Sequence, residues 1–173
     1  MKKSHKFFFN LAFNLAEKNL GRTGNNPSVG CVIVKNNSVI SSGMTSFNGR
    51  PHAEYNALNK KINFKGSNMY VTLEPCTHYG LTPPCTNIIK QKKIDKIFYT
   101  FNDPDTRTYK KARKVLKKIV KINRISKQNK NFYKSYFLNK NNKFPLIDAK
   151  LAISKDYYSI SKISKWITNL NQE

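Results

Sequence analysis

The chain is poor in cysteine and in long apolar runs, and each shortage excludes a class of protein. Three Cys among 173 residues do not form a disulfide framework, so metal binding or catalysis is the better use for them. No apolar run approaches the roughly 20 residues that cross a bilayer. With 39% hydrophobic and 12% aromatic residues, the composition fits one folded domain, and the chain is too short for two full ones.

A secretion signal is also missing, although three Phe residues follow lysines near the N-terminus. Asn10, Asn14, Glu17 and Lys18 interrupt any apolar core there. The apolar spacing over residues 4–20 instead predicts an amphipathic first helix. We therefore expect a cytoplasmic protein with no membrane partner.

Acidic residues are scarce as well, which leaves a net charge of +23 from 32 basic and nine acidic residues. Of the basic residues 27 are Lys, dispersed along the chain, and five are Arg. Nucleic-acid readers concentrate charge on one face and use Arg for bidentate contacts. A solvated Lys-rich surface and a polyanion-binding surface both stay open. In either case we expect nucleic-acid binding to be at most non-specific and sensitive to salt.

Strands and helices alternate along most of the sequence after one hairpin. We expect strands over residues 29–34, 39–42, 69–73, 96–100 and 120–125, and later helices over 51–58, 85–89, 109–118 and 129–138. This order predicts an α/β sandwich around a mixed sheet. We expect a linker at residues 140–143 and a further strand over 144–153. Cys31, among Val and Ile in the first strand, is interpreted as a small buried hydrophobe.

The rare chemistry-bearing residues gather in one stretch, which holds two of the three His, two of the three Cys and two of the four Glu. His52, Cys76 and Cys85 form a nitrogen and sulfur ligand set that suits Zn²⁺ and leaves a fourth position for water. Zinc lowers the pKa of such a water towards ~7. Glu54, two residues from a ligand at a helix start, is the candidate proton carrier. Zinc-dependent nucleobase deaminases use the same arrangement of three ligands and one free Glu.

A purely structural zinc site would normally have four protein ligands. His78 is the remaining candidate for a fourth ligand in this stretch. Without it, the three-ligand set favours catalysis.

Three motifs resemble the deaminase domain of the bifunctional riboflavin-biosynthesis deaminase/reductase family. They are the runs 26–34 (NPSVGCVIV), 51–54 (PHAE) and 72–85 (TLEPCTHYGLTPPC), and the similarity continues through Asp103 and Pro104. Eight residues separate Cys76 from Cys85, whereas tRNA and cytidine deaminases have two between theirs. The resemblance implies a cytidine deaminase-like α/β/α sandwich around a five-stranded mixed sheet.

It also implies a reaction. The substrate would be 2,5-diamino-6-(ribosylamino)pyrimidin-4-one 5'-phosphate, and hydrolytic deamination at ring carbon 2 would give 5-amino-6-(5-phosphoribosylamino)uracil. By the same resemblance Asn26 would bind the substrate and His78 would help to hold its phosphate end. An Asx turn before Pro27 is the alternative role for Asn26, and an ordinary loop role is the alternative for His78.

The chain departs from the family pattern at three places. Leu81 stands where the family usually has Arg or Lys, and Thr45 replaces a usual His. Residues 107–112 (RTYKKA) replace the glycines expected after Pro104. The first change removes an expected phosphate contact, for which Arg50 or nearby Lys residues are possible substitutes.

The last segment resembles the opening of the family's reductase domain in residues 144–154 and 164–168, including Ser164 and Trp166. We therefore expect a deaminase domain over residues 1–143 and an incomplete start of a reductase domain over 144–173. No phosphate-cradling glycine loop accompanies it, so no dinucleotide cofactor is expected and a separate reductase would be needed. We also expect a homo-oligomer.

Two rival functions stay open. A nucleic-acid base deaminase of the tRNA type would account for the charge but predicts a short Cys-x-x-Cys spacing. A catalytically weakened partner subunit would account for Leu81 and Thr45, although the presence of Glu54 argues against it.

Overall fold

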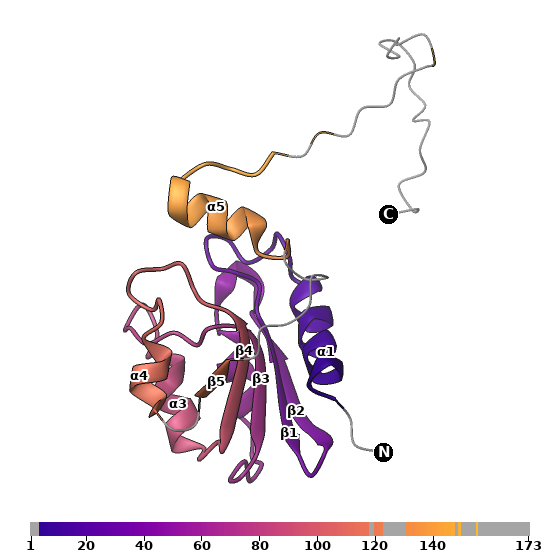
Figure 1. Ribbon diagram of the computed structural model, residues 1–173, viewed down its shortest axis with the longest axis vertical. Coiled ribbons are helices and arrows are strands. Elements are labelled where there is room, and N and C mark those ends of the chain that lie inside the picture. Colours follow the sequence, from indigo (N-terminus) through magenta and orange to yellow (C-terminus); the bar gives the residue numbers. More distant parts are fainter. Residues whose placement is uncertain (1–3, 118–119, 123–130, 148, 150–154, 156–173) are drawn as a thin grey trace.

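A mixed sheet lies at the centre of the protein in the computed structural model, which describes residues 4–117, 120–122, 131–147, 149 and 155 (Figure 1). The strand order is β2-β1-β3-β4-β5. β1 is antiparallel to both β2 and β3, whereas β3, β4 and β5 are parallel to one another. The strands are β1 (Gly30–Lys35), β2 (Ser38–Met44), β3 (Asn68–Leu73), β4 (Lys96–Phe101) and the three-residue β5 (Val120–Ile122).

Helices cover both faces of the sheet, as the α/β/α prediction requires (Figure 1). α1 (His5–Glu17) covers one face, where its Phe8, Phe9 and Ala12 pack with Val32 and Val34 of β1. The opposite face carries α2 (Ala53–Leu58), α3 (Cys85–Gln91) and α4 (Ala112–Leu116). The alternating residues of β1, β3 and β4 therefore serve two separate hydrophobic layers. The predicted α/β fold class is confirmed.

Local sequence explains how the first elements begin and turn. Ser4 caps α1, with its hydroxyl accepting a hydrogen bond from the Phe7 N–H at 3.4 Å. Asn36 and Asn37 join β1 to β2 with φ angles of 50° and 62°. Two consecutive positive φ values match the twist of a hairpin, and Asn tolerates them better than most residues.

Gly43 allows α2 to lie very close to β2. A Cβ atom at this position would lie 2.5 Å from the Ala53 carbonyl oxygen and 2.5 Å from the Ala57 nitrogen. Both atoms belong to the helix backbone, which no side-chain rotation can move away. The absence of a side chain at residue 43 therefore sets the distance between this helix and the sheet.

Two expectations for the C-terminal part were wrong. The last described helix, α5, spans Lys134–Asn142 rather than 129–138, so the expected linker at 140–143 belongs mostly to this helix. Residues 144–147 form no strand, and Phe144 and Ile147 are exposed. The rest of the expected strand and nearly all of the expected reductase segment lie outside the described residues. The predicted division into two domains stays a prediction.

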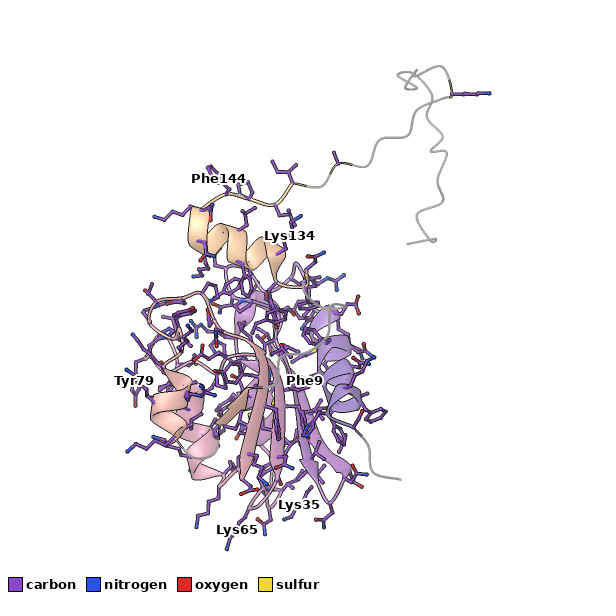
Figure 2. All side chains as sticks on the ribbon, in the orientation of Figure 1. Phe9, Lys35, Lys65, Tyr79, Lys134 and Phe144 are labelled. Carbon is purple, nitrogen blue, oxygen red and sulfur yellow. The ribbon has the colours of Figure 1, made fainter. Side chains whose placement is uncertain are left out.

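The basic side chains are spread over the surface of the described part of the chain. Figure 2 shows Lys35 and Lys65 at the end of the sheet opposite to α5, which carries Lys134.

Among the described residues, no helix has the length and apolar character that crossing a membrane requires.

Candidate functional site

Three potential metal ligands meet at one edge of the sheet, each supplied by the end of an element. His52 precedes α2, Cys76 follows β3, and Cys85 is the first residue of α3. One ligand atom of each residue lies within 4.8 Å of the other two. Cys76 and Cys85 lie 24 and 33 positions from His52 in the sequence. The three residues converge because α2 and α3 pack on the same face of the sheet, beside the carboxyl end of β3.

The distances within this group fit a zinc ion. The His52 Nδ1 atom lies 3.6 Å from the Cys76 Sγ atom and 3.4 Å from the Cys85 Sγ atom. A tetrahedral zinc with ordinary Zn–S and Zn–N bond lengths separates such ligand atoms by about 3.5 Å. Within the described residues His78 is not a member of the group, and its Nδ1 lies 3.0 Å from the Thr108 hydroxyl instead. The arrangement therefore has the three protein ligands of an open site.

Hydrogen bonds between the ligands already favour a thiolate. The bond from the Cys85 thiol, aided by His52 and by the Cys85 backbone N–H at 3.2 Å, lowers the pKa of Cys76 to about 4 against the opposing effect of burial. The same thiol–thiolate bond, together with burial, raises the pKa of Cys85 well above its usual value. A bound divalent cation favours the thiolate form of both sulfurs.

Glu54 lies in the first turn of α2, beside the ligand group, and only 4% of its surface is exposed. It lines the same cavity as His52 and Cys76. Burial, followed by the nearby Cys76 thiolate, raises the pKa of Glu54 to about 7. A carboxyl group with a pKa near neutrality can both accept and release a proton at physiological pH.

Asn26 and His78 both line this cavity. The substrate binding that the resemblance implied for them stays a prediction. The Asn26 side-chain amide donates a hydrogen bond to the Gly49 carbonyl at 3.0 Å, across 23 residues, instead of closing a local Asx turn. This bond fixes the amide at the cavity wall. His78 lies in the long loop between the two cysteines and is partly buried.

Two of the departures from the family pattern, at residues 45 and 81, occupy very different places. Thr45 lines the cavity and is 1% exposed, and its hydroxyl accepts a hydrogen bond from the Val29 N–H at 2.9 Å. Leu81 is 87% exposed and does not line the cavity. A hydroxyl therefore replaces an imidazole inside the site, whereas the change at residue 81 lies on the surface.

Much of the rest of the cavity wall could not be predicted from the sequence. Glu74 directly follows β3, and its buried carboxylate accepts hydrogen bonds from the backbone N–H groups of Asp103 at 3.2 Å, Lys110 at 3.0 Å and Ala112 at 3.1 Å. These bonds hold the loop after β4 against the cavity. Further wall residues to which the sequence assigned no role come from this loop and from α5: Asp103, Asp105, Arg107, Tyr136 and Lys140. The available signals were the position of Glu74 next to Pro75 and Cys76 and the family similarity that reaches Asp103.

Comparison with known proteins was decisive for the family. Residues 2–101 match the family described as the cytidine and deoxycytidylate deaminase zinc-binding region. The chain belongs to this deaminase family. The family's zinc-binding character agrees with the ligand group formed by His52, Cys76 and Cys85.

More specific relatives of this deaminase carry names from riboflavin biosynthesis. The diaminohydroxyphosphoribosylamino-pyrimidine deaminase of Buchnera aphidicola subsp. Schizaphis graminum is 38% identical over 136 residues, which are 76% of this chain and 92% of that protein. The riboflavin biosynthesis protein RibD of Haemophilus influenzae is 37% identical over 93% of this chain, but over 45% of its own length. The chain therefore spans about half the length of the RibD relatives it matches.

A solved structure gives the same result for the fold. Acinetobacter baumannii RibD, form 2, superimposes with a TM-score of 0.80 at 32% identity, covering 91% of this chain and 48% of that protein. The similarity supports the cytidine deaminase-like fold of the described residues.

Proposed function

We propose that this deaminase catalyses the hydrolytic deamination of 2,5-diamino-6-(ribosylamino)pyrimidin-4-one 5'-phosphate to 5-amino-6-(5-phosphoribosylamino)uracil. The observation that carries the proposal is the convergence of His52, Cys76 and Cys85 beside the buried Glu54. The eight residues between the cysteines, 77–84, form an insert loop that contributes His78, Gly80 and Thr82 to the same cavity. The relatives named for this reaction support the choice of substrate.

In the proposed reaction His52, Cys76 and Cys85 would hold the zinc ion. When bound, zinc supplies a Lewis acid that makes water nucleophilic near neutral pH. Glu54 accepts the proton of the attacking water as the new C–O bond forms at ring carbon 2, and it returns this proton to the ring nitrogen that receives the electron pair of the opening C=N bond. The same carboxylate then carries the proton of the new hydroxyl to the departing amine as the C=O bond forms and the C–N bond breaks, and ammonia leaves. These transfers use one buried group, which shields the exchanged proton from bulk water.

Asn26 and His78 are the proposed substrate contacts beyond the metal group. The bond to Gly49 uses the amide nitrogen of Asn26, so its side-chain oxygen is the atom best suited to receive a hydrogen bond from the substrate ring. His78 lies on the insert loop, where its bond to Thr108 orients the ring at the cavity wall.

The direct test is ammonia release by purified, zinc-loaded protein. We expect turnover of the diaminopyrimidine phosphate and none of cytidine or of transfer RNA under the same conditions. The RNA arm is run across a salt series, because non-specific binding to the Lys-rich surface weakens steeply with salt. Site-specific base conversion in RNA, without release of ammonia from the small phosphate, would overturn the proposal. Turnover of no substrate by zinc-loaded protein would instead favour a weakened partner subunit.

The partners follow from this function. We expect a small pyrimidine ribotide as substrate and a reductase that consumes the uracil product. The Thermotoga maritima relative, whose structure is solved, is named as both such a deaminase and a 5-amino-6-(5-phosphoribosylamino)uracil reductase. The expected homo-oligomer stays a prediction. Size-exclusion chromatography with light scattering would test it.

A further inference from the structure

The cavity contains a cation that the family motifs do not require, at the boundary between the metal group and the insert loop. Arg50 precedes the motif Pro51 to Glu54, and it lines the cavity together with His52. Leu81, the residue that stands in place of the family's usual cation, is exposed outside the cavity wall. Arg50, and not residue 81, thus places a guanidinium at the cavity wall.

Arg50 is held in place by the insert loop. Its Nη1 atom donates a hydrogen bond to the Thr82 hydroxyl at 3.0 Å. Gly80 is a near neighbour, because a Cβ atom built on it would lie 3.6 Å from the Arg50 Nη2 atom. The bond to Thr82 therefore ties this flexible side chain to the insert loop without using the side chain of residue 81.

The other cations of the cavity wall are already engaged. Arg107 forms a bidentate pair with Asp105, at 2.9 Å from Nε to Oδ1 and 2.7 Å from Nη2 to Oδ2. The Lys140 ammonium lies 3.8 Å from the same carboxylate. Within the part of the chain that the structure describes, Arg50 has no carboxylate partner. Its guanidinium keeps most of its donors available for a ligand.

We propose that Arg50 recognises the 5'-phosphate of the substrate and replaces the cation lost at Leu81. A guanidinium matches two phosphate oxygens with parallel N–H donors, and the bond to Thr82 uses only one nitrogen. The inference rests on the proposed function for the identity of the substrate, but not for the existence of the anion site. Arg50 then determines specificity for phosphorylated over unphosphorylated pyrimidine ribosides.

The kinetic test compares the diaminopyrimidine riboside with and without its phosphate. Zinc-loaded wild type is measured beside Arg50→Ala, Arg50→Gln and Arg113→Ala. Arg113, an exposed residue of α4 outside the cavity, is the matched control for the loss of one surface charge. Arg50→Gln keeps the aliphatic stem of the side chain and removes the guanidinium, which guards against a loop that rearranges in Arg50→Ala.

We expect both Arg50 variants to lower kcat/KM for the phosphorylated substrate by about 10- to 100-fold, mainly through KM. The unphosphorylated substrate should change less than about twofold, and Arg113→Ala should affect neither. If the Arg50 variants keep the wild-type ratio of kcat/KM between the two substrates, whether or not both values fall, the proposal is overturned.

A binding measurement separates this proposal from the proposed function. Ribose 5-phosphate, followed by ³¹P NMR, should bind wild type and Arg113→Ala equally and Arg50→Gln at least about tenfold more weakly. If wild type deaminates neither riboside but this difference persists, the function is wrong and the anion site stands. If no riboside is turned over and Arg50→Gln binds ribose 5-phosphate as well as wild type does, the anion site is wrong.

Discussion

The two halves of the cavity are built in different ways. The metal half uses side chains at the starts of α2 and α3 and just after β3, all within two short sequence motifs. The recognition half consists of the insert loop, the loop after β4 and α5, which are far apart in the sequence. Backbone ends of packed elements position the first half, whereas hydrogen bonds between side chains and loops position the second.

This contrast separates chemistry from recognition. The residues proposed to hold zinc and move protons depend on the packing of α2 and α3 against the sheet. The residues proposed to select the substrate depend on bonds such as those of Glu74 to the loop after β4 and of Tyr136 to Asp103. Substitutions in the two halves should therefore have different signatures, which four experiments can compare.

The largest effect is expected from loss of a metal ligand. Cys76→Ala and Cys85→Ala should each lose zinc and all measurable deamination, because two ligands rarely retain the ion against dilution. Metal analysis should find one zinc per chain in wild type. Cys31→Ala, which alters a buried thiol of β1 outside the ligand group, is the control and should keep its zinc. Full zinc content in both ligand variants would contradict the assignment.

Glu54→Gln should keep the metal and the fold but lose turnover. The amide preserves the shape of the side chain and removes the proton carrier, which costs about 10²–10⁴-fold in rate for a general acid or base. The decrease should appear in kcat, with little change in ribose 5-phosphate binding. A loss smaller than about tenfold would remove Glu54 from this role.

Glu74→Gln should act on the recognition half. The amide replaces one acceptor oxygen with a donor that faces backbone N–H groups, so the buried loop anchor is lost. We expect the free energy of unfolding to fall by about 1–3 kcal/mol in urea titrations, with zinc retained. Glu17→Gln, on the exposed side of α1, is the matched control. Zinc loss without a change in stability would show that the two halves are not independent.

Tyr136→Phe should give the smallest effect. It removes the hydroxyl that donates a hydrogen bond to the Asp103 carboxylate at 2.9 Å, while the ring can stay packed against Tyr133 and Phe137. A single hydrogen bond of this kind contributes about 0.5–1.5 kcal/mol, or more when one partner is charged. We expect KM for the substrate to rise a few-fold and kcat to stay constant. A decrease in kcat alone would place Tyr136 closer to the chemistry than α5 suggests.

The same contrast explains what could be predicted from the sequence. The metal group and Glu54 were accessible because scarce residue types cluster in motifs, and the structure does bring the three expected ligands together. The strands were accessible because each apolar run is short and bounded by turn residues. Agreement was within one or two residues for β1, β3 and β4.

The recognition half was not accessible from local patterns. Residues 134–142 have almost no apolar periodicity, so a helix that rests on only a few aromatic contacts looked partly like a linker. Lys140 and Tyr136 reach the cavity only because α5 packs near the loop after β4, which is a long-range contact. Likewise, the orientation of Arg50 depends on Thr82, 32 residues away.

The close approach of α2 to β2 at Gly43 makes this residue sensitive to mutation. Its lack of a side chain lets α2 rest on β2, and the start of α2 carries both His52 and Glu54. Replacement by Ala would force the helix backbone outward by roughly an ångström, since a Cβ contact of 2.5 Å is far below van der Waals separation. Under the proposed function, a screen for riboflavin auxotrophs would therefore recover substitutions at this residue, although it has no functional group and belongs to no metal motif. Such alleles would resemble catalytic mutants in their phenotype while being defects of helix placement.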